Sequence, residues 1–135
     1  MTPAPLLDTH IWLWWLLGDS RLSREESRVL DELPKENRPA LSVISLWEVA
    51  MLVELGRVQL DLTLNEFLQG ACSPETVRLL PLNLDVVVEM NTLPSTIHRD
   101  PADRLIVSSA RAEGLSLATH DRKIIEADLV PIWRA

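Results

Sequence analysis

Short apolar runs alternate with longer helical stretches along almost the whole chain, and this order strongly constrains the fold. The sequence predicts strands at residues 4–7, 40–43, 77–80, 115–118 and 130–133, and helices at residues 9–17, 23–33, 45–55, 64–71, 84–93, 101–114 and 122–127. Strands separated by helices need crossover connections, which give a parallel sheet covered on both faces. We therefore predict an α/β fold: a single three-layer domain over residues 1–135, with helices on both faces of a five-stranded parallel sheet.

Local signals at helix ends support these boundaries. Ser23 and Glu26 have the spacing of a capping box at the start of a helix. Asp100 followed by Pro101 is typical of an N-cap residue and the first helical position. Gly56 suits the left-handed conformation that ends many helices.

The composition is that of a globular protein, with 47% hydrophobic and 24% charged residues. Its net charge of -7 argues against tight, non-specific binding of nucleic acid through a broad basic face. The same acidity is compatible with a metal site, because bound divalent cations reverse the local charge.

The single cysteine, Cys72, excludes an internal disulfide and any multi-cysteine zinc site. We interpret Cys72 as a small, buried apolar side chain in a reducing compartment. The apolar run at residues 11–17 is shorter than the roughly 20 residues that span a bilayer, and the N-terminus lacks the positive flank of a secretory signal. We expect a soluble, cytoplasmic protein without a membrane contact.

Four acidic residues occupy positions from which they can meet at one edge of the predicted sheet. Asp8 and Asp121 directly follow predicted strands, whereas Glu48 and Asp103 lie in the first turns of predicted helices. In open parallel sheets, ligands bind beyond the carboxyl ends of the strands. Crowded carboxylates repel one another unless cations neutralise them, so the four acids predict a site for Mg²⁺ or Mn²⁺.

Each acid also has a structural interpretation. Asp8 and Asp121 are suitable helix N-caps, and Glu48 completes a capping box with Ser45. Asp103 is the most informative, because apolar residues follow it at offsets of three, four and seven and place it on the core-facing side of its helix. We assign Asp100 to capping.

Four blocks of this sequence resemble the PIN-domain ribonucleases, above all the VapC-type toxins of bacterial toxin–antitoxin pairs. They are LLDTHIW at residues 6–12, SLWEVA at 45–50, RDPADRLI at 99–106 and LATHD at 117–121. The blocks occur in the family's order and extend over nearly the whole chain.

The resemblance implies a divalent-metal-dependent ribonuclease that hydrolyses RNA phosphodiester bonds. It assigns the metal-binding and catalytic acids to Asp8, Glu48, Asp103 and Asp121. Thr119, and more weakly Thr9, match positions that support the metal site. A homodimer and a neutralising antitoxin partner are also implied. Because the chain has only two lysines, contacts to RNA phosphates fall to nearby arginines, for which the candidates are Arg99, Arg104 and Arg122.

Three tryptophans, Trp12, Trp14 and Trp15, crowd one short predicted helix and cannot all point the same way at about 100° per residue. We expect one or two of them in the core and the remainder in an exposed patch for a dimer or an antitoxin, with RNA base stacking as a further alternative. Trp47 and Trp133 are assigned to the core.

Alternatives from other classes remain weaker. A phosphoacceptor receiver would show paired acids after its first strand, and an aspartyl phosphatase would show an Asp-x-Asp pair where this chain has His10. His10, His98 and His120 lack the spacing of zinc ligands. The alternative that stays open is a non-catalytic interaction or signalling module whose acids serve only as helix caps.

Overall fold

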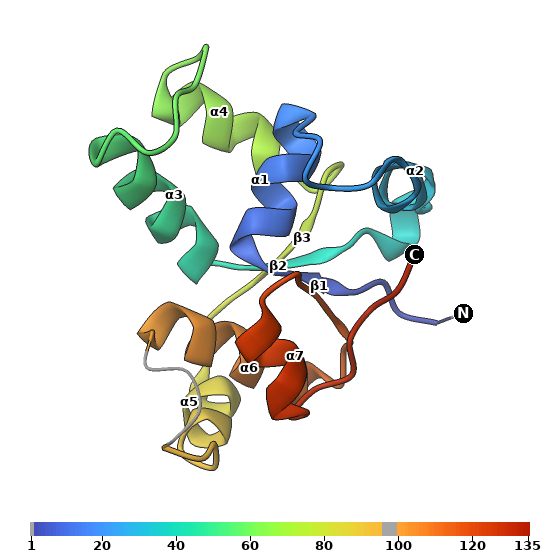
Figure 1. Cartoon of the computed structure of the whole chain (residues 1–135), viewed down its shortest axis with the longest axis vertical. Coiled ribbons are helices and arrows are strands. Elements are labelled where there is room, and N and C mark those ends of the chain that lie inside the picture. Colours follow the sequence, from blue (N-terminus) through green and yellow to red (C-terminus); the bar gives the residue numbers. More distant parts are fainter. Residues whose placement is uncertain (1, 96–99) are drawn as a thin grey trace.

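A computed structural model describes residues 2–95 and 100–135 of the chain (Figure 1). Within these residues a parallel sheet has four strands in the order β3-β2-β1-β4. The strands are β1 (Leu6–Leu7), β2 (Ala40–Ser42), β3 (Arg78–Leu80) and β4 (Leu117–Ala118). The prediction of an α/β fold with a parallel sheet is confirmed.

The helices agree closely with the sequence pattern. They are α1 (Thr9–Leu17), α2 (Arg24–Glu32), α3 (Ile44–Glu54), α4 (Leu64–Ala71), α5 (Leu84–Met90), α6 (Pro101–Glu113) and α7 (Arg122–Ala127). A short 3-10 turn, Lys35–Asn37, was not predicted. Ser23 and Glu26 form the predicted capping box, and Gly18 ends α1 in the left-handed conformation that favours glycine.

The prediction of a fifth strand at residues 130–133 is wrong for the described chain. This segment runs parallel to β4 but pairs with it through a single bridge, between Leu117 and Ile132. The Leu117 amide donates to the Pro131 carbonyl at 2.8 Å, and the Trp133 amide donates to the Leu117 carbonyl at 2.9 Å. Pro131 has no amide hydrogen with which to extend a ladder, so the pairing stays local.

The strands alternate their side chains between two hydrophobic clusters, one on each face of the sheet. Leu6, which pairs in register with Ala40 and Leu117, joins the cluster that contains α6 and α7 residues. The next residue, Leu7, joins the opposite cluster, which contains residues of α1, α3 and α4. Figure 1 shows these two groups of helices on opposite sides of the sheet. Both faces are covered, as expected for parallel strands.

The tryptophans divide between core and surface. Trp12 is fully buried, and its indole Nε1 donates to the Ala71 carbonyl at 3.0 Å. Trp14, Trp15 and Trp133 are partly buried against the same cluster. The assignment of Trp47 to the core is wrong, because this residue on α3 is 53% exposed.

None of the helices in the described ranges is long and apolar enough to cross a membrane.

The strand order places β1 at the point where the connections diverge. From β1 the chain proceeds to β2 and β3 on one side, and β4 lies on the other side of β1. Ligands of open α/β sheets bind at the carboxyl ends of the strands at such a point. The residues that follow β1, β2 and β4 are Asp8, Val43 and Thr119, so this edge is where a site is expected.

Candidate metal centre

Asp8 lies at the carboxyl end of β1 and caps α1. Its side chain is only 4% exposed. The Thr9 amide donates to one carboxylate oxygen at 2.7 Å, and the Thr119 hydroxyl donates to the other at 2.7 Å. Asp8 is therefore an N-cap, and the Thr119 hydroxyl, which follows β4, additionally fixes the orientation of its carboxylate.

Glu48 does not cap its helix. The N-cap residue of α3 is Val43. Among the described residues, the Val43 side chain forms no capping hydrogen bond with the helix. Instead, the Thr9 hydroxyl donates to Glu48 Oε1 at 2.5 Å and shares a 2.8 Å hydrogen bond with the Ser45 hydroxyl. The capping-box interpretation of Ser45 and Glu48 is wrong, and both side chains are used in contacts with α1.

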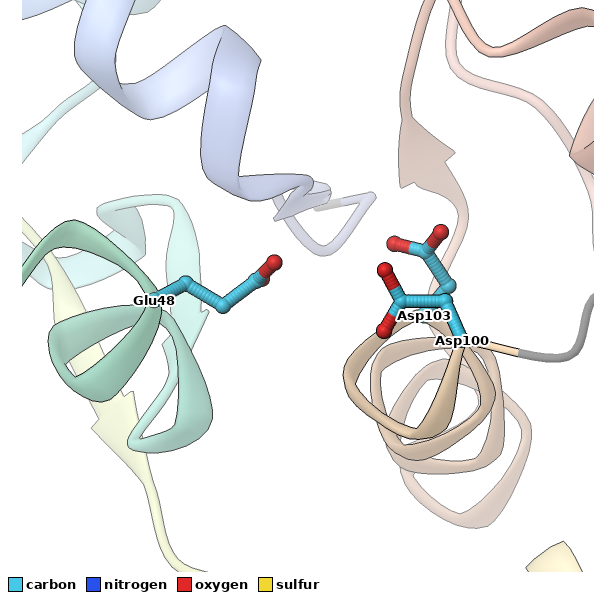
Figure 2. A group of neighbouring side chains, drawn as sticks. All are labelled: Glu48, Asp100 and Asp103. Atoms are coloured by element: carbon cyan, nitrogen blue, oxygen red, sulfur yellow. The ribbon is translucent and has the colours of Figure 1, made fainter. Parts of the chain in front are cut away.

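Glu48, Asp100 and Asp103 form one group of acids. Each offers a carboxylate oxygen within 4.8 Å of the others. Figure 2 shows the Glu48 side chain extending from α3 toward the two carboxylates at the start of α6. Asp100 also accepts a hydrogen bond from the Ala102 amide at 2.9 Å, which is its predicted capping role. Its place beside Glu48 was not predicted, because a capping role already explained its position in the sequence.

Asp121 lies beside Asp8 and not within the group of three. It caps α7 through hydrogen bonds from the Lys123 and Ile124 amides at 2.9 and 3.3 Å. The Asp121 amide donates to the Thr119 hydroxyl at 3.0 Å. The Thr119 hydroxyl therefore connects Asp121 to Asp8, whose pKa is raised in part by the charge of Asp121.

The acids influence one another across the site. Burial, opposed by hydrogen bonds from Thr119 and Thr9, raises the pKa of Asp8 above its ordinary value. Burial also raises the pKa of Glu48, and the charges of Asp8 and Asp100 raise it further. The ionisation of Glu48 is therefore coupled to the charges of Asp8 and of Asp100, the N-cap residue of α6. Neighbouring carboxylates that disfavour one another's charge and offer only oxygen donors fit a hard divalent cation such as Mg²⁺.

The raised pKa of Asp8 predicts a stability difference that depends on pH. Since the folded-state pKa lies above the ordinary value of 3.8, the folded protein holds the proton more tightly, and stability is lost as pH rises through this window. At neutral pH without metal, Asp8→Asn is therefore expected to raise Tm relative to wild type. The difference should shrink as the pH falls and disappear well below the ordinary value of 3.8, where Asp8 is protonated in both states.

Thermal unfolding in chelator at several pH values measures this difference. Added Mg²⁺ should then raise the Tm of wild type more than that of Asp8→Asn, because protons and metal compete for the same carboxylate. A variant that is less stable than wild type at neutral pH in chelator would contradict the prediction.

The Thr119 hydroxyl predicts an effect on both stability and metal affinity. Thr119→Val removes the donor to Asp8 and the acceptor for the Asp121 amide. We expect a loss of about 1–3 kcal/mol in the free energy of unfolding and a loss of about 10–100-fold in Mg²⁺ affinity. Urea denaturation and calorimetry measure the two effects. Thr119→Ser keeps the hydroxyl and should retain most of the stability and most of the Mg²⁺ affinity. Equal losses in Thr119→Val and Thr119→Ser would exclude this role of the hydroxyl group.

The three arginines proposed for RNA contacts differ in their surroundings. Arg104 donates to the Pro94 carbonyl at 3.2 Å. Arg122 is exposed and lies 4.0 Å from Glu126, one helical turn away. Arg99 falls outside the described residues. None of these observations tests a contact with RNA, so the three assignments stay predictions.

Comparison with known proteins agrees with the fold and with the sequence blocks. Residues 6–129 match the PIN domain family. Ribonuclease VapC22 from Mycobacterium tuberculosis is 35% identical over 119 residues, which cover 88% of each chain. FitAcB from Neisseria gonorrhoeae has a TM-score of 0.71 and 25% sequence identity, with 96% of each chain covered.

A further similar structure is VapBC2 from Rickettsia felis, bound to a DNA fragment from their promoter. It has a TM-score of 0.69 and 17% identity over 96% of this chain and 97% of that chain, which shows a likeness of fold alone. The family match extends over residues 6–129, which include Asp8, Glu48, Asp103 and Asp121, and the similarity to VapC22 covers 88% of the chain. The chain therefore belongs to the PIN-domain family, in its VapC-type branch.

Proposed function

We propose that this protein is a divalent-metal-dependent ribonuclease that hydrolyses RNA phosphodiester bonds and acts as the toxin of a toxin–antitoxin pair. Its similarity to Ribonuclease VapC22 supports the activity. The observation that carries the proposal is the close approach of Glu48, Asp100 and Asp103 from two separate helices. Helix capping alone does not require Glu48 to face α6.

In this proposal, Asp8 and Asp103 are the principal metal ligands, and Glu48 and Asp121 bind directly or through water. We add Asp100 to this set because its carboxylate lies with those of Glu48 and Asp103. A bound divalent cation would supply a water of lowered pKa and offset the charge on the leaving oxygen. Thr119 holds the Asp8 carboxylate in one orientation, and Thr9 does the same for Glu48.

The all-oxygen donor set favours Mg²⁺, with Mn²⁺ as a substitute of similar ligand preference. Because the oxygens belong to several crowded acids, the metal-free site carries repulsion that a cation relieves. Metal binding is thus expected to stabilise the folded protein as well as to activate it.

We further propose RNA as the substrate, a protein antitoxin as the partner, a homodimer as the assembly and the cytoplasm as the location. The family resemblance supports all four. FitAB bound to an IR36 DNA fragment is among the similar structures, with a TM-score of 0.69. This chain has a net charge of -7, so contacts with DNA would be supplied by the antitoxin rather than by this chain.

The expected result of the direct test is RNA cleavage that depends on added metal. Purified protein, free of any antitoxin, is incubated with assorted RNAs in Mg²⁺, in Mn²⁺ and in chelator. Cleavage should occur with either metal and stop in chelator, because the acids alone do not supply an activated water. Cleavage that persists in chelator would point to a contaminant or to another mechanism.

The alternative is a non-catalytic module whose acids only cap helices. The capping hydrogen bonds of Asp8, Asp100 and Asp121 favour it. Calorimetry with Mg²⁺ separates the two functions, since a module needs no divalent cation. Absence of metal binding that depends on Asp8 and Asp103 would favour the module.

A further inference from the structure

Three aromatic rings and one guanidinium group lie in contact beside the acids, and the ring planes of neighbours are tilted by 47° and 52°. The ring centroids of His10 and Trp14 lie 5.8 Å apart, and those of Trp14 and His120 lie 5.4 Å apart. The guanidinium carbon of Arg21 lies 5.0 Å from the centroid of the Trp14 ring. We call these four side chains, His10, Trp14, Arg21 and His120, the aromatic ladder.

The aromatic ladder begins at the acids and leads away from them. His10 is two residues beyond Asp8 on α1, and its charge favours the ionised forms of Asp8 and Glu48. His120 lies between Thr119 and Asp121 in the chain. Trp14 also lines a cavity of about 340 Å³ with residues of the segment 18–27. Trp14 therefore contacts the rings next to the acids and at the same time borders this cavity.

The side chains of the ladder are held in place by carboxylates. Asp19 accepts two hydrogen bonds from Arg21, at 3.0 and 2.7 Å, and so fixes the plane of the guanidinium group. Glu26 lies 2.9 Å from Nε2 of His120. Both side chains nevertheless keep much of their surface in solvent, 66% for Arg21 and 40% for His120. The ladder thus presents ordered, flat and accessible groups.

The carboxylates also decide which part of a nucleotide the ladder suits. Because Asp19 offsets the positive charge of Arg21, and the Glu26 carboxylate lies against His120, the ladder attracts phosphate weakly. Unpaired nucleobases, in contrast, stack on histidine, tryptophan and arginine planes, and their edges form hydrogen bonds with polar side chains. With a net charge of -7, this chain has little general attraction for RNA. Stacking supplies affinity that does not depend on a basic surface.

We propose that the aromatic ladder binds an unpaired nucleobase next to the scissile phosphate and so positions single-stranded RNA at the acids. This inference rests on the proposed ribonuclease activity. Arg21 and His120 are positioning residues in it, and Trp14 is the support that holds them. Recognition depends on the flat shapes of these groups, so charge alone should not replace them.

Two pairs of variants separate shape from charge. Arg21→Ala removes the guanidinium plane, whereas Arg21→Lys keeps the charge without the plane. His120→Ala removes the ring, whereas His120→Phe keeps a ring without the nitrogen that contacts Glu26. The matched control is Arg28→Ala, because Arg28 is an exposed arginine on α2 that pairs with Glu32. Each protein is assayed with Mg²⁺ on a short single-stranded RNA, and on the same RNA with one base removed at each position in turn.

Arg21→Ala, Arg21→Lys and His120→Ala are each expected to raise KM about 10-fold with little change in kcat. Arg28→Ala should behave like wild type, and His120→Phe should raise KM less than His120→Ala does, because it keeps a ring for stacking. Removal of one base near the cleavage site should cost wild type about 10-fold in kcat/KM and should cost Arg21→Ala nothing further, because both changes remove the same stacking contact.

The outcomes distinguish this inference from the proposed function. A wild-type protein that cleaves no RNA in either metal overturns the ribonuclease proposal, and the ladder's role is lost with it. If wild type is active, two results would overturn the role of the ladder alone. One is full activity of Arg21→Lys, and the other is a loss on base removal that is equal in every variant. Ladder variants that cleave normally but bind an antitoxin less tightly would assign these side chains to the protein partner instead.

Discussion

Asp103→Asn is expected to lower RNA cleavage by about 10³-fold while leaving the fold intact, and Asp8→Asn should have a similar effect on cleavage. Asparagine has nearly the shape of aspartate but lacks the charge that attracts a cation and supports the build-up of charge at phosphorus. Loss of one preorganised electrostatic group in an active site costs about 10²–10³ in rate, and loss of a direct metal ligand should reach the upper end. Metal-dependent cleavage of RNA under single-turnover conditions measures the change.

Glu113→Gln is the matched control for Asp103→Asn. It removes an exposed carboxylate from the other end of the same helix, α6, far along the chain from the acid group. Its cleavage rate and Mg²⁺ affinity should equal those of wild type. If Asp8→Asn and Asp103→Asn both kept full activity, the proposed ligand assignment would be excluded. Calorimetry on each variant shows whether a loss of rate accompanies a loss of metal binding.

Trp12→Ala is expected to lower the free energy of unfolding by about 4 kcal/mol, in the range for large aromatic residues replaced in a core. Trp12 of α1 is fully buried in the hydrophobic cluster that α1, α3 and α4 form on one face of the sheet. Its ring contacts that of Phe67 of α4, with the ring centroids 6.2 Å apart. The substitution leaves a cavity and deprives the Ala71 carbonyl of the indole donor. Urea denaturation in chelator measures the loss without a contribution from metal.

Trp47→Ala is the comparison that tests the burial argument. Because Trp47 is 53% exposed on α3, its replacement is expected to change the free energy of unfolding by less than about 1 kcal/mol. The two variants remove the same side chain from the same protein, so the difference between them reports the environment alone. Similar losses in both would show that the core around Trp12 relaxes to fill the space.

Helix positions were predictable where the chain carries its own end signals. Thr9–Leu17 was predicted at both ends because Asp8 caps its start and Gly18, with a φ of 65°, ends it. Leu64–Ala71 was likewise predicted at both ends, and Thr63 forms a capping box with Glu66 at its start. These signals act within a few residues, so they can be read without knowledge of the tertiary structure.

Predictions failed where distant contacts decide the outcome. In α3, apolar residues surround most of the helix, so periodicity does not tell which side faces the core, and Trp47 was assigned wrongly. Glu48 and Ser45 have the spacing of a capping box, but the N-cap residue of α3 is Val43, two residues before Ser45, and Thr9 binds both side chains.

The acids themselves were predicted in part. The edge on which Asp8 and Asp121 lie follows from the order of parallel strands and helices. The proximity of Asp100 to Glu48 depends on how α6 packs against α3, and no short-range pattern contains that information. Asp100 caps α6, and this local role explained its place in the sequence, so its proximity to Glu48 and Asp103 was not predicted.

The hydrogen bond from Thr119 to Asp8 joins residues 111 positions apart in the chain. A growing polypeptide that has not yet emerged from the ribosome as far as β4 cannot make this bond, and one that ends before residue 100 lacks two of the grouped carboxylates. The full set of acids therefore comes together only after almost the whole chain has been synthesised.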